Sequence, residues 1–302
     1  MFFKESEKCP LIGNDTMSMK KAKGFVRLLR FELPFSAGVC VVMGQILALG
    51  GFASASEILY GFFSVFFISA SILVLNDYFD VETDRLNAPD RPIPSKLVTA
   101  SEALLLSISL MLAGLVLSYL ISFMALLLSL VLLIVGSLYN RNYKKSGLPG
   151  NLMVSFSVGM TFIYGGVSVG LPFNSIVWLF AAIAALIDLG EEIAADAMDM
   201  QGDLLISSRS LAIRYGGRFA LRISGYIFFS VILLTSVPFI FGWLPAIYLL
   251  PIAIMDISIA YSSLRLLGSG NDTRAGRKYI RHIYLGSTSG LLVFILMRLL
   301  EM

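Results

Sequence analysis

Two acidic motifs with the same spacing lie far apart in the chain. Each contains three aspartates separated by two and then by three residues: Asp77, Asp80 and Asp84 in the first, and Asp196, Asp199 and Asp203 in the second. At about 100° per residue, this spacing gathers three carboxylates within roughly a 60° arc of a continuous helix. Like charges at helical spacing repel one another, so each stripe requires a compensating cation.

Mg²⁺ supplies such a charge, because it prefers oxygen ligands and joins one or two carboxylates to the phosphate groups of a substrate. The motifs therefore predict two helices that hold a diphosphate through Mg²⁺, and a solvated acidic helix end is the alternative without chemistry. Asn76 extends the first motif, and Asp77 has a second interpretation, in which it orients a basic neighbour. The predicted metal ligands are Asn76, Asp77, Asp80, Asp84, Asp196, Asp199 and Asp203.

Basic and aromatic residues near the motifs are candidates for binding the diphosphate. An ammonium is a point-charge partner for phosphate, and the face of a tyrosine ring stabilises a cation. Lys144 and Lys145 have a simpler alternative role, which is to fix topology and bind anionic lipid head groups. Arg91 and Arg209 either hold a phosphate of the acceptor or offset the carboxylates. The predicted substrate-binding residues are Arg30, Arg91, Tyr139, Arg141, Lys144, Lys145, Asn151, Glu192 and Arg209.

The composition shows which elements must position these residues. Of the 302 residues, 57% are hydrophobic and only 14% are charged, against roughly 45–50% and about 25% in soluble domains. Such a surplus of apolar side chains belongs in a bilayer and excludes disorder, a nucleic-acid module and a disulfide-rich secreted fold. We therefore predict an all-α integral membrane protein surrounded by lipids, with no nucleic-acid partner and no obligate protein partner.

Nine apolar segments are long enough to cross the bilayer as helices, which need about 20 residues. They are residues 33–50, 57–75, 103–120, 124–140, 151–169, 175–195, 217–238, 244–266 and 280–300. Residues 1–24 form a polar N-terminal tail without the apolar core of a signal peptide, and residues 25–302 form one membrane domain.

The basic residues orient these spans. Every Lys and Arg except Arg298 falls on one side, which the positive-inside rule assigns to the cytoplasm. The sixth span is kept although its apolar part ends at Asp188, because without it all later basic residues would change sides. The N-terminus is then cytoplasmic and the C-terminus outside. Four spans separate the acidic motifs, so both emerge at the cytoplasmic surface and can face each other.

The motifs resemble those of the UbiA-type intramembrane prenyltransferases. Asn76-Asp77-x2-Asp80-x3-Asp84, followed by the run from Arg85 to Pro94, is similar to their first aspartate motif. Asp196-x2-Asp199-x2-Gly202-Asp203, followed by Ser210-Leu211-Ala212, is similar to their second. The resemblance covers essentially the whole chain. It implies nine helices around a central cavity and Mg²⁺-dependent transfer of an isoprenoid from an allylic diphosphate to a second, often lipidic, acceptor.

The resemblance also implies roles for individual residues. Tyr139 and Lys144 match the tyrosine and lysine that lie near the diphosphate in that family. The residues expected to carry the reaction are Asp80, Asp84, Tyr139, Lys144, Asp199 and Asp203. Two departures concern the second motif: Glu191 stands where arginine is usual, and Ile206 to Ser210 replace the expected glycine and threonine.

Within the family, the run from Pro89 to Pro94 and the Glu192-Ile193 pair look most like the ether-lipid enzymes, the digeranylgeranylglyceryl phosphate synthases. We therefore expect transfer of a geranylgeranyl group to the free hydroxyl of a geranylgeranylglyceryl phosphate. An aromatic quinone precursor or a chlorophyll-like alcohol is the alternative acceptor. A cation transporter is the alternative from another class, although transporter sites lie near the membrane midplane on broken helices.

Two isolated ionisable residues receive mainly structural interpretations. Asp256 lies inside the eighth span, where an ionisable residue is a functional candidate by default. Nearby serines can pair with it, which favours a structural role. His282, the only histidine, has no partner set for nucleophilic catalysis in the sequence.

Overall fold

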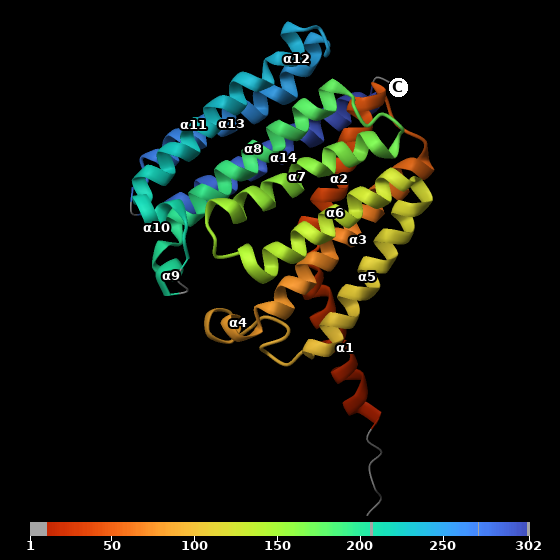
Figure 1. Ribbon diagram of the computed structural model, residues 1–302, viewed down its shortest axis with the longest axis vertical. Coiled ribbons are helices and arrows are strands. Elements are labelled where there is room, and N and C mark those ends of the chain that lie inside the picture. The colour runs from red at the N-terminus through yellow and green to blue at the C-terminus, as the bar shows by residue number, and fades with distance from the viewer. Residues whose placement is uncertain (1–10, 206–207, 271, 301–302) are drawn as a thin grey trace, which may run out of the picture.

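The computed structural model describes residues 11–205, 208–270 and 272–300, and within these ranges the chain forms helices and no strand (Figure 1). Nine long helices coincide with the nine predicted spans. They are α2 (Glu32–Leu49), α3 (Ala55–Phe79), α5 (Ala100–Ile121), α6 (Phe123–Leu138), α7 (Leu148–Ser168), α8 (Ser175–Met198), α11 (Gly217–Thr235), α13 (Leu249–Leu267) and α14 (Thr273–Leu300).

Shorter or more polar elements connect and precede these helices. Helix α1 (Leu11–Leu29) occupies most of the predicted polar tail, whose first ten residues lie outside the described part. The others are α4 (Val81–Asn87), a π-helical turn (Tyr139–Tyr143), α9 (Met200–Leu205), α10 (Leu211–Tyr215), α12 (Val237–Ile240) and a 3₁₀ turn (Ala246–Tyr248).

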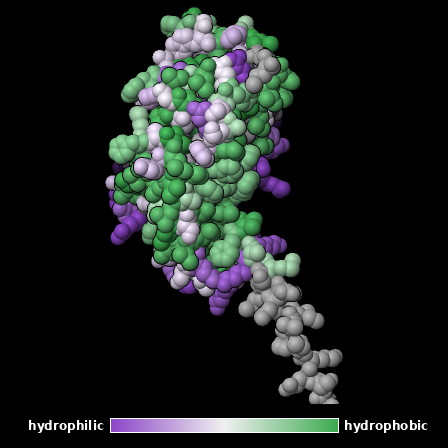
Figure 2. Space-filling view, turned by 90° about the vertical axis from the view of Figure 1, so that its right-hand side faces the viewer, coloured by the Kyte–Doolittle hydropathy of each residue, from purple (hydrophilic) through white to green (hydrophobic). Residues whose placement is uncertain are grey.

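Eight helical segments in the described part are long and apolar enough to span a membrane. The remaining predicted span, the sixth, corresponds to α8. It carries Asp188, Glu191, Glu192 and Asp196 and is less apolar, but its 24 residues are about 36 Å long at ~1.5 Å per residue. It packs between α7 and α11. Figure 2 shows a largely apolar flank with hydrophilic residues gathered toward the lower end. The prediction of an all-α polytopic membrane bundle is confirmed.

Local sequence signals set where the helices begin. Ser54 with Glu57, and Thr99 with Glu102, form capping boxes at the starts of α3 and α5. The side chain of Asn174 accepts hydrogen bonds from two backbone N–H groups at the start of α8. These caps satisfy backbone donors that would otherwise be unpaired at the membrane boundary.

Small residues allow the central helices to approach closely. A Cβ atom on Gly165 of α7 would collide with the carbonyl oxygen of Val41 on α2, and one on Gly44 would collide with that of Phe162. Gly165, in the fifth predicted span, therefore serves close contact between α7 and α2.

Both acidic motifs lie at helix ends on the same side of the bundle. Figure 1 shows α4 and α9 at one end of the long helices, whereas α12 and the C-terminus lie at the other.

The prediction that each acidic motif forms a stripe along one continuous helix is wrong. Helix α3 ends before Asp80 and α8 ends before Asp199, and both aspartates have φ near −90° and ψ near 0° (−87° and 2°; −104° and 9°). This conformation interrupts an α-helix and often occurs at active sites. Each motif therefore turns a corner at its middle aspartate.

Candidate active site

Two guanidinium groups hold the first and last aspartates of the first motif. Asp77 is buried and forms ion pairs with Arg30 and, at 3.5 Å, with Nη1 of Arg91. The same Nη1 lies 2.6 Å from Oδ2 of the buried Asp84. Arg30 has a φ of +43°, which is unusual for a residue with a side chain, and connects α1 to α2. Asp77 thus contacts two basic side chains, which agrees with the alternative to metal binding, namely that Asp77 orients a basic neighbour.

The middle of the first motif contacts the π-helical turn. Asp80 forms an ion pair with Lys144, and Asn76 hydrogen-bonds the side chain of Asn140 at 3.0 Å. Asn140 in turn donates to the carbonyl oxygen of Ile72 at 3.0 Å. A π-helical turn widens the helix locally and frequently marks a functional site. Here it fastens the segment that carries Tyr139 and Lys144 to the end of α3.

The second motif is positioned by α7 and α14. Asp196 accepts a hydrogen bond of 2.9 Å from Nδ2 of Asn151, and Asp199 forms an ion pair with Arg277. Gly276 packs against the sulfur of Met198, which brings the first turn of α14 to the end of α8. The side chain of Asp203 lies outside the described part of the structure. Arg277 entered the sequence analysis only as one of the cytoplasmic basic residues, because its proximity to Asp199 depends on how α14 packs.

The loop after the π-helical turn meets the loop after the second motif. Gly147, with a φ of +72°, lies so close to Arg209 that a Cβ atom would collide with the Arg209 carbonyl group. The backbone N–H of Arg209 donates to the carbonyl oxygen of Lys145 at 3.0 Å. Arg209 therefore joins the segment after the second motif to the segment that carries Lys144.

A cavity of about 620 Å³ is lined by Arg30, Arg91 and Lys144, which contact the aspartates of the first motif, and it extends into the bundle. This volume is typical of small-molecule sites. The charged and amide side chains lie at one end of the lining, whereas most of the wall is apolar. The polar end consists of Arg30, Asn76, Arg91, Tyr139, Asn140, Lys144, Asp188, Glu191 and Glu192. The cavity therefore suits a molecule with an anionic head and a long hydrocarbon chain.

The structure separates the predicted substrate-binding residues into two groups. Five line the cavity, namely Arg30, Arg91, Tyr139, Lys144 and Glu192. Asn76, a predicted metal ligand, lines it as well. Four lie outside its lining: Arg141, Lys145, Asn151 and Arg209. Arg141 is exposed on the π-helical turn and Lys145 is exposed just after it, whereas Asn151 donates a hydrogen bond to Asp196.

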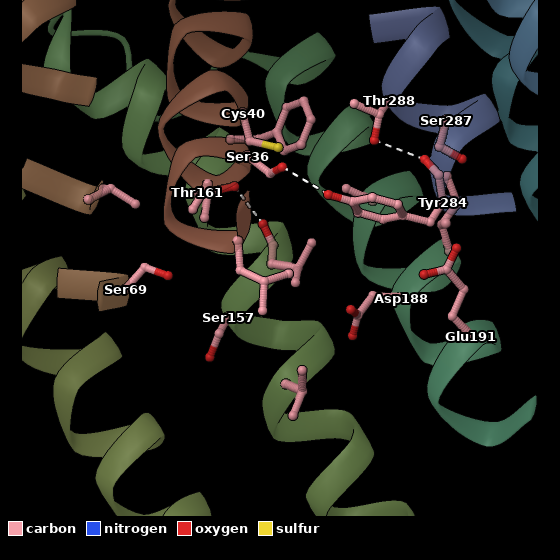
Figure 3. Close-up of a pocket in the computed structure, with 18 of the residues that line it drawn as sticks. Ser36, Cys40, Ser69, Ser157, Thr161, Asp188, Glu191, Tyr284, Ser287 and Thr288 are labelled. Atoms are coloured by element: carbon pink, nitrogen blue, oxygen red, sulfur yellow. Dashed lines mark hydrogen bonds between the residues drawn. The ribbon is translucent and has the colours of Figure 1, made fainter. Parts of the chain in front are cut away.

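Polar residues that the sequence analysis did not select form a band within the cavity (Figure 3). Ser36 on α2 hydrogen-bonds the hydroxyl of Tyr284 on α14 at 3.0 Å. Asp188 accepts from Ser155 at 2.9 Å, and Oε1 of Glu191 is buried without a hydrogen-bond partner. Glu191 differs from the family pattern, and this departure was the one signal in the sequence that pointed to it.

The donor groups fit Mg²⁺ chemically, although they are not gathered into a finished metal site. Among the described residues, no three acidic, histidine or cysteine side chains are close enough to hold a metal ion. Asp80 and Asp199 are instead neutralised by Lys144 and Arg277. Mg²⁺ usually takes few protein carboxylates and several phosphate or water oxygens. The oxygen donors at this end of the bundle therefore suit an ion that arrives with a diphosphate.

A largely apolar cavity with acidic and basic groups at its mouth, inside a helical membrane bundle, is the architecture expected of an intramembrane transferase of isoprenoid chains. The model of the UbiA prenyltransferase family matches residues 37–286, so the chain belongs to this family and is a multi-pass membrane prenyltransferase. The family assignment favours this class over the cation transporter.

Individual relatives are similar over nearly the whole chain. Digeranylgeranylglyceryl phosphate synthase of Methanocaldococcus jannaschii is 33% identical over 260 residues, which cover 86% of this chain and 90% of that one. A solved structure from work on digeranylgeranylglyceryl phosphate synthase in membranes has a TM-score of 0.76 at 31% identity and covers 91% of this chain and 98% of that one. A UbiA homologue from Archaeoglobus fulgidus, solved with GPP and Mg²⁺, shares the fold at 17% identity with a TM-score of 0.61, over 89% of this chain and 99% of that one.

Proposed function

We propose that the protein transfers a geranylgeranyl group from its diphosphate to the free hydroxyl of a geranylgeranylglyceryl phosphate, forming the second ether bond of a membrane lipid. The observation that carries the proposal is the shape of the cavity: apolar walls along most of its length, with anion-binding and acidic groups at one end. The similarity to digeranylgeranylglyceryl phosphate synthases supports this acceptor over an aromatic one.

The reaction requires the bond between C1 and the diphosphate oxygen to lengthen, which puts positive charge on the allyl group and negative charge on the leaving group. Bound Mg²⁺ supplies Lewis-acid stabilisation of that leaving group. Its proposed ligands are Asn76, Asp80, Asp84, Asp196, Asp199 and Asp203. Asp77 contributes instead by fixing Arg30 and Arg91 at the cavity mouth.

Charged groups next to the diphosphate act most strongly where water is excluded. Lys144 lines the cavity and pairs with Asp80, so it can turn from that carboxylate to a phosphate oxygen when the donor binds. The ring of Tyr139 lines the cavity at the same end and is positioned to stabilise the allyl cation. Attack by the acceptor hydroxyl then forms the ether bond, and its proton leaves to the diphosphate or to a carboxylate.

The positive-inside distribution supports a cytoplasmic site. Because the basic residues gather on the side of the acidic motifs, we propose that the N-terminus and the cavity mouth face the cytoplasm and the C-terminus faces outward. The donor diphosphate would then enter from the cytoplasm, and the acceptor would enter from the lipid phase.

A product assay tests the function directly. Purified protein supplied with geranylgeranyl diphosphate should give the diether product, identified by mass, from geranylgeranylglyceryl phosphate and from no aromatic acid or chlorophyll-like alcohol. Chelation with EDTA should abolish turnover, and added Mg²⁺ should restore it, because the carboxylates alone repel the diphosphate. Preferred prenylation of an aromatic acceptor would overturn the proposed acceptor, and full activity after chelation would overturn the metal requirement.

Two neighbouring lysines provide a matched test of donor binding. Lys144→Ala should raise the KM for the prenyl diphosphate about tenfold or more, because one charge-assisted contact to phosphate is lost. Lys145→Ala should leave that KM within about twofold, because Lys145 is exposed and lies outside the cavity lining. Steady-state kinetics with varied donor measure both values. Equal effects of the two substitutions would favour a role for both in topology or lipid binding alone.

A further inference from the structure

The inner end of the cavity is closed by two stacked aromatic rings. Phe294 of α14 is 3% exposed, and its ring centroid lies 4.4 Å from that of Tyr248 with an interplanar angle of 26°. Tyr248 is fully enclosed, and its hydroxyl accepts a hydrogen bond of 3.2 Å from Nη1 of Arg298. Phe294 is therefore backed by a second ring that is itself held in place.

A second hollow, of about 460 Å³, lies behind this stack, and Phe294 lines both spaces. Two other helices, α2 and α8, also pass from one space to the other, and on each the residues that line the two spaces are about one helical turn apart. On α2, Met43 lines the cavity whereas Ile46 lines the second hollow. On α8, Phe180 lines the cavity whereas Ile176 lines the second hollow. The two spaces are thus consecutive along the bundle, and Phe294 stands between them.

The length of the cavity matches one chain length of the donor. Glu192 at the polar end and Phe180 near the stack are twelve residues apart on α8, which is about 18 Å at ~1.5 Å per residue. Four isoprene units place sixteen carbons in line, and at roughly 3.5 Å for every three bonds they extend over about 18 Å. A fifth unit would add about 5 Å and meet the Phe294 ring.

The second hollow binds hydrocarbon less favourably than the cavity does. Its wall includes Asn174, Ser175 and Arg298, and burial of hydrocarbon against polar groups gains less free energy than burial against apolar ones. A chain of five units would have to displace Phe294 to reach a less favourable space.

We propose that Phe294, backed by Tyr248, is the floor of the prenyl compartment and sets the upper limit of donor length at four isoprene units. The proposal rests on the proposed function for the identity of the occupant as a prenyl diphosphate. The geometry of the floor is independent of which acceptor the enzyme uses.

Donor selectivity tests the floor. Binding of farnesyl, geranylgeranyl and geranylfarnesyl diphosphates, with three, four and five units, would be measured with Mg²⁺ by displacement of a radiolabelled donor, and kcat/KM by product mass. Phe294→Ala should raise the preference for five units over four at least about tenfold, since one methylene in a hydrophobic pocket already changes selectivity by about that factor. Phe228→Ala is the matched control, because Phe228 is fully buried on α11 but lines neither space.

A second variant changes the same compartment on the side of the polar end, and its result does not depend on whether Phe294→Ala folds well. Ala184 also lines the cavity and lies one helical turn closer to the polar end than Phe180 on α8. Ala184→Phe should therefore shorten the compartment and move the donor preference from four isoprene units to three. Unchanged selectivity in both variants would overturn the proposal and indicate that the chain leaves the cavity sideways. An equal change in Phe228→Ala would also overturn it, because general loosening would then explain the effect. The proposed function fails separately, if donor binding is intact but no lipid acceptor is prenylated.

Discussion

Asp80→Asn and Asp199→Asn should each lower kcat by at least about a hundredfold, a loss comparable to removal of a single stabilising group at other active sites. Both residues lie where a helix is interrupted within an acidic motif. Each forms an ion pair with a basic side chain, which Mg²⁺ can replace as the partner of the carboxylate. Asparagine keeps the size of the side chain but removes the charge that the proposed Mg²⁺ ligation requires. Rates of prenyl transfer at saturating substrates measure the effect.

A neighbouring acid supplies the control. Glu82 lies in α4 between the aspartates of the first motif, but its side chain is 82% exposed and pairs with Arg85 on the surface. Glu82→Gln should therefore retain nearly full activity. All three variants should insert into the membrane normally, and after solubilisation in detergent they should elute from a size-exclusion column at the same volume as the unchanged protein, because no apolar packing is removed. Normal turnover in both aspartate variants would contradict the role of the corners in holding the metal.

Arg91→Gln should both destabilise the protein and remove most activity. Arg91 bridges Asp77 and Asp84, which are 3% and 6% exposed, and its removal leaves buried carboxylates with fewer compensating charges. Breaking a fully buried pair costs about 3–5 kcal/mol; because Arg91 is itself 36% exposed, we expect a smaller loss, on the order of 2 kcal/mol. The temperature of irreversible inactivation in detergent should fall by several degrees, and the KM for the donor should rise.

Two further variants separate charge from geometry at this position. Arg91→Lys should restore only part of the stability, because an ammonium cannot present the planar fork of donors that a guanidinium offers to two carboxylates. Arg85→Gln should have almost no effect, since the Arg85–Glu82 pair is exposed and surface pairs contribute about 0–1 kcal/mol. If Arg91→Gln is as stable as Arg85→Gln, the bridge does not hold the first motif together.

The sequence by itself determined the kind of molecule and the end of the bundle at which both acidic motifs lie. A bilayer leaves the backbone few choices, so apolar length predicted eight of the nine long helices. The distribution of basic residues was needed to keep the other one, α8, whose apolar part ends at Asp188. The distribution of lysine and arginine placed both motifs at one end of the bundle, and the fold agrees. Tyr139 and Lys144 were likewise selected from the sequence, and both line the cavity.

Only the tertiary structure decided how those residues are used. The spacing of the aspartates predicted straight stripes, but a periodic pattern cannot reveal that the chain turns at Asp80 and Asp199. The contact of Arg277 with Asp199, the band around Glu191 and the stack of Phe294 on Tyr248 join residues from helices distant in sequence. Such contacts depend on which helix faces pack together, and an almost uniformly apolar helix carries little information about its facing side. The sequence therefore predicted which charged residues lie near the helix ends, whereas packing determined the cavity between the helices.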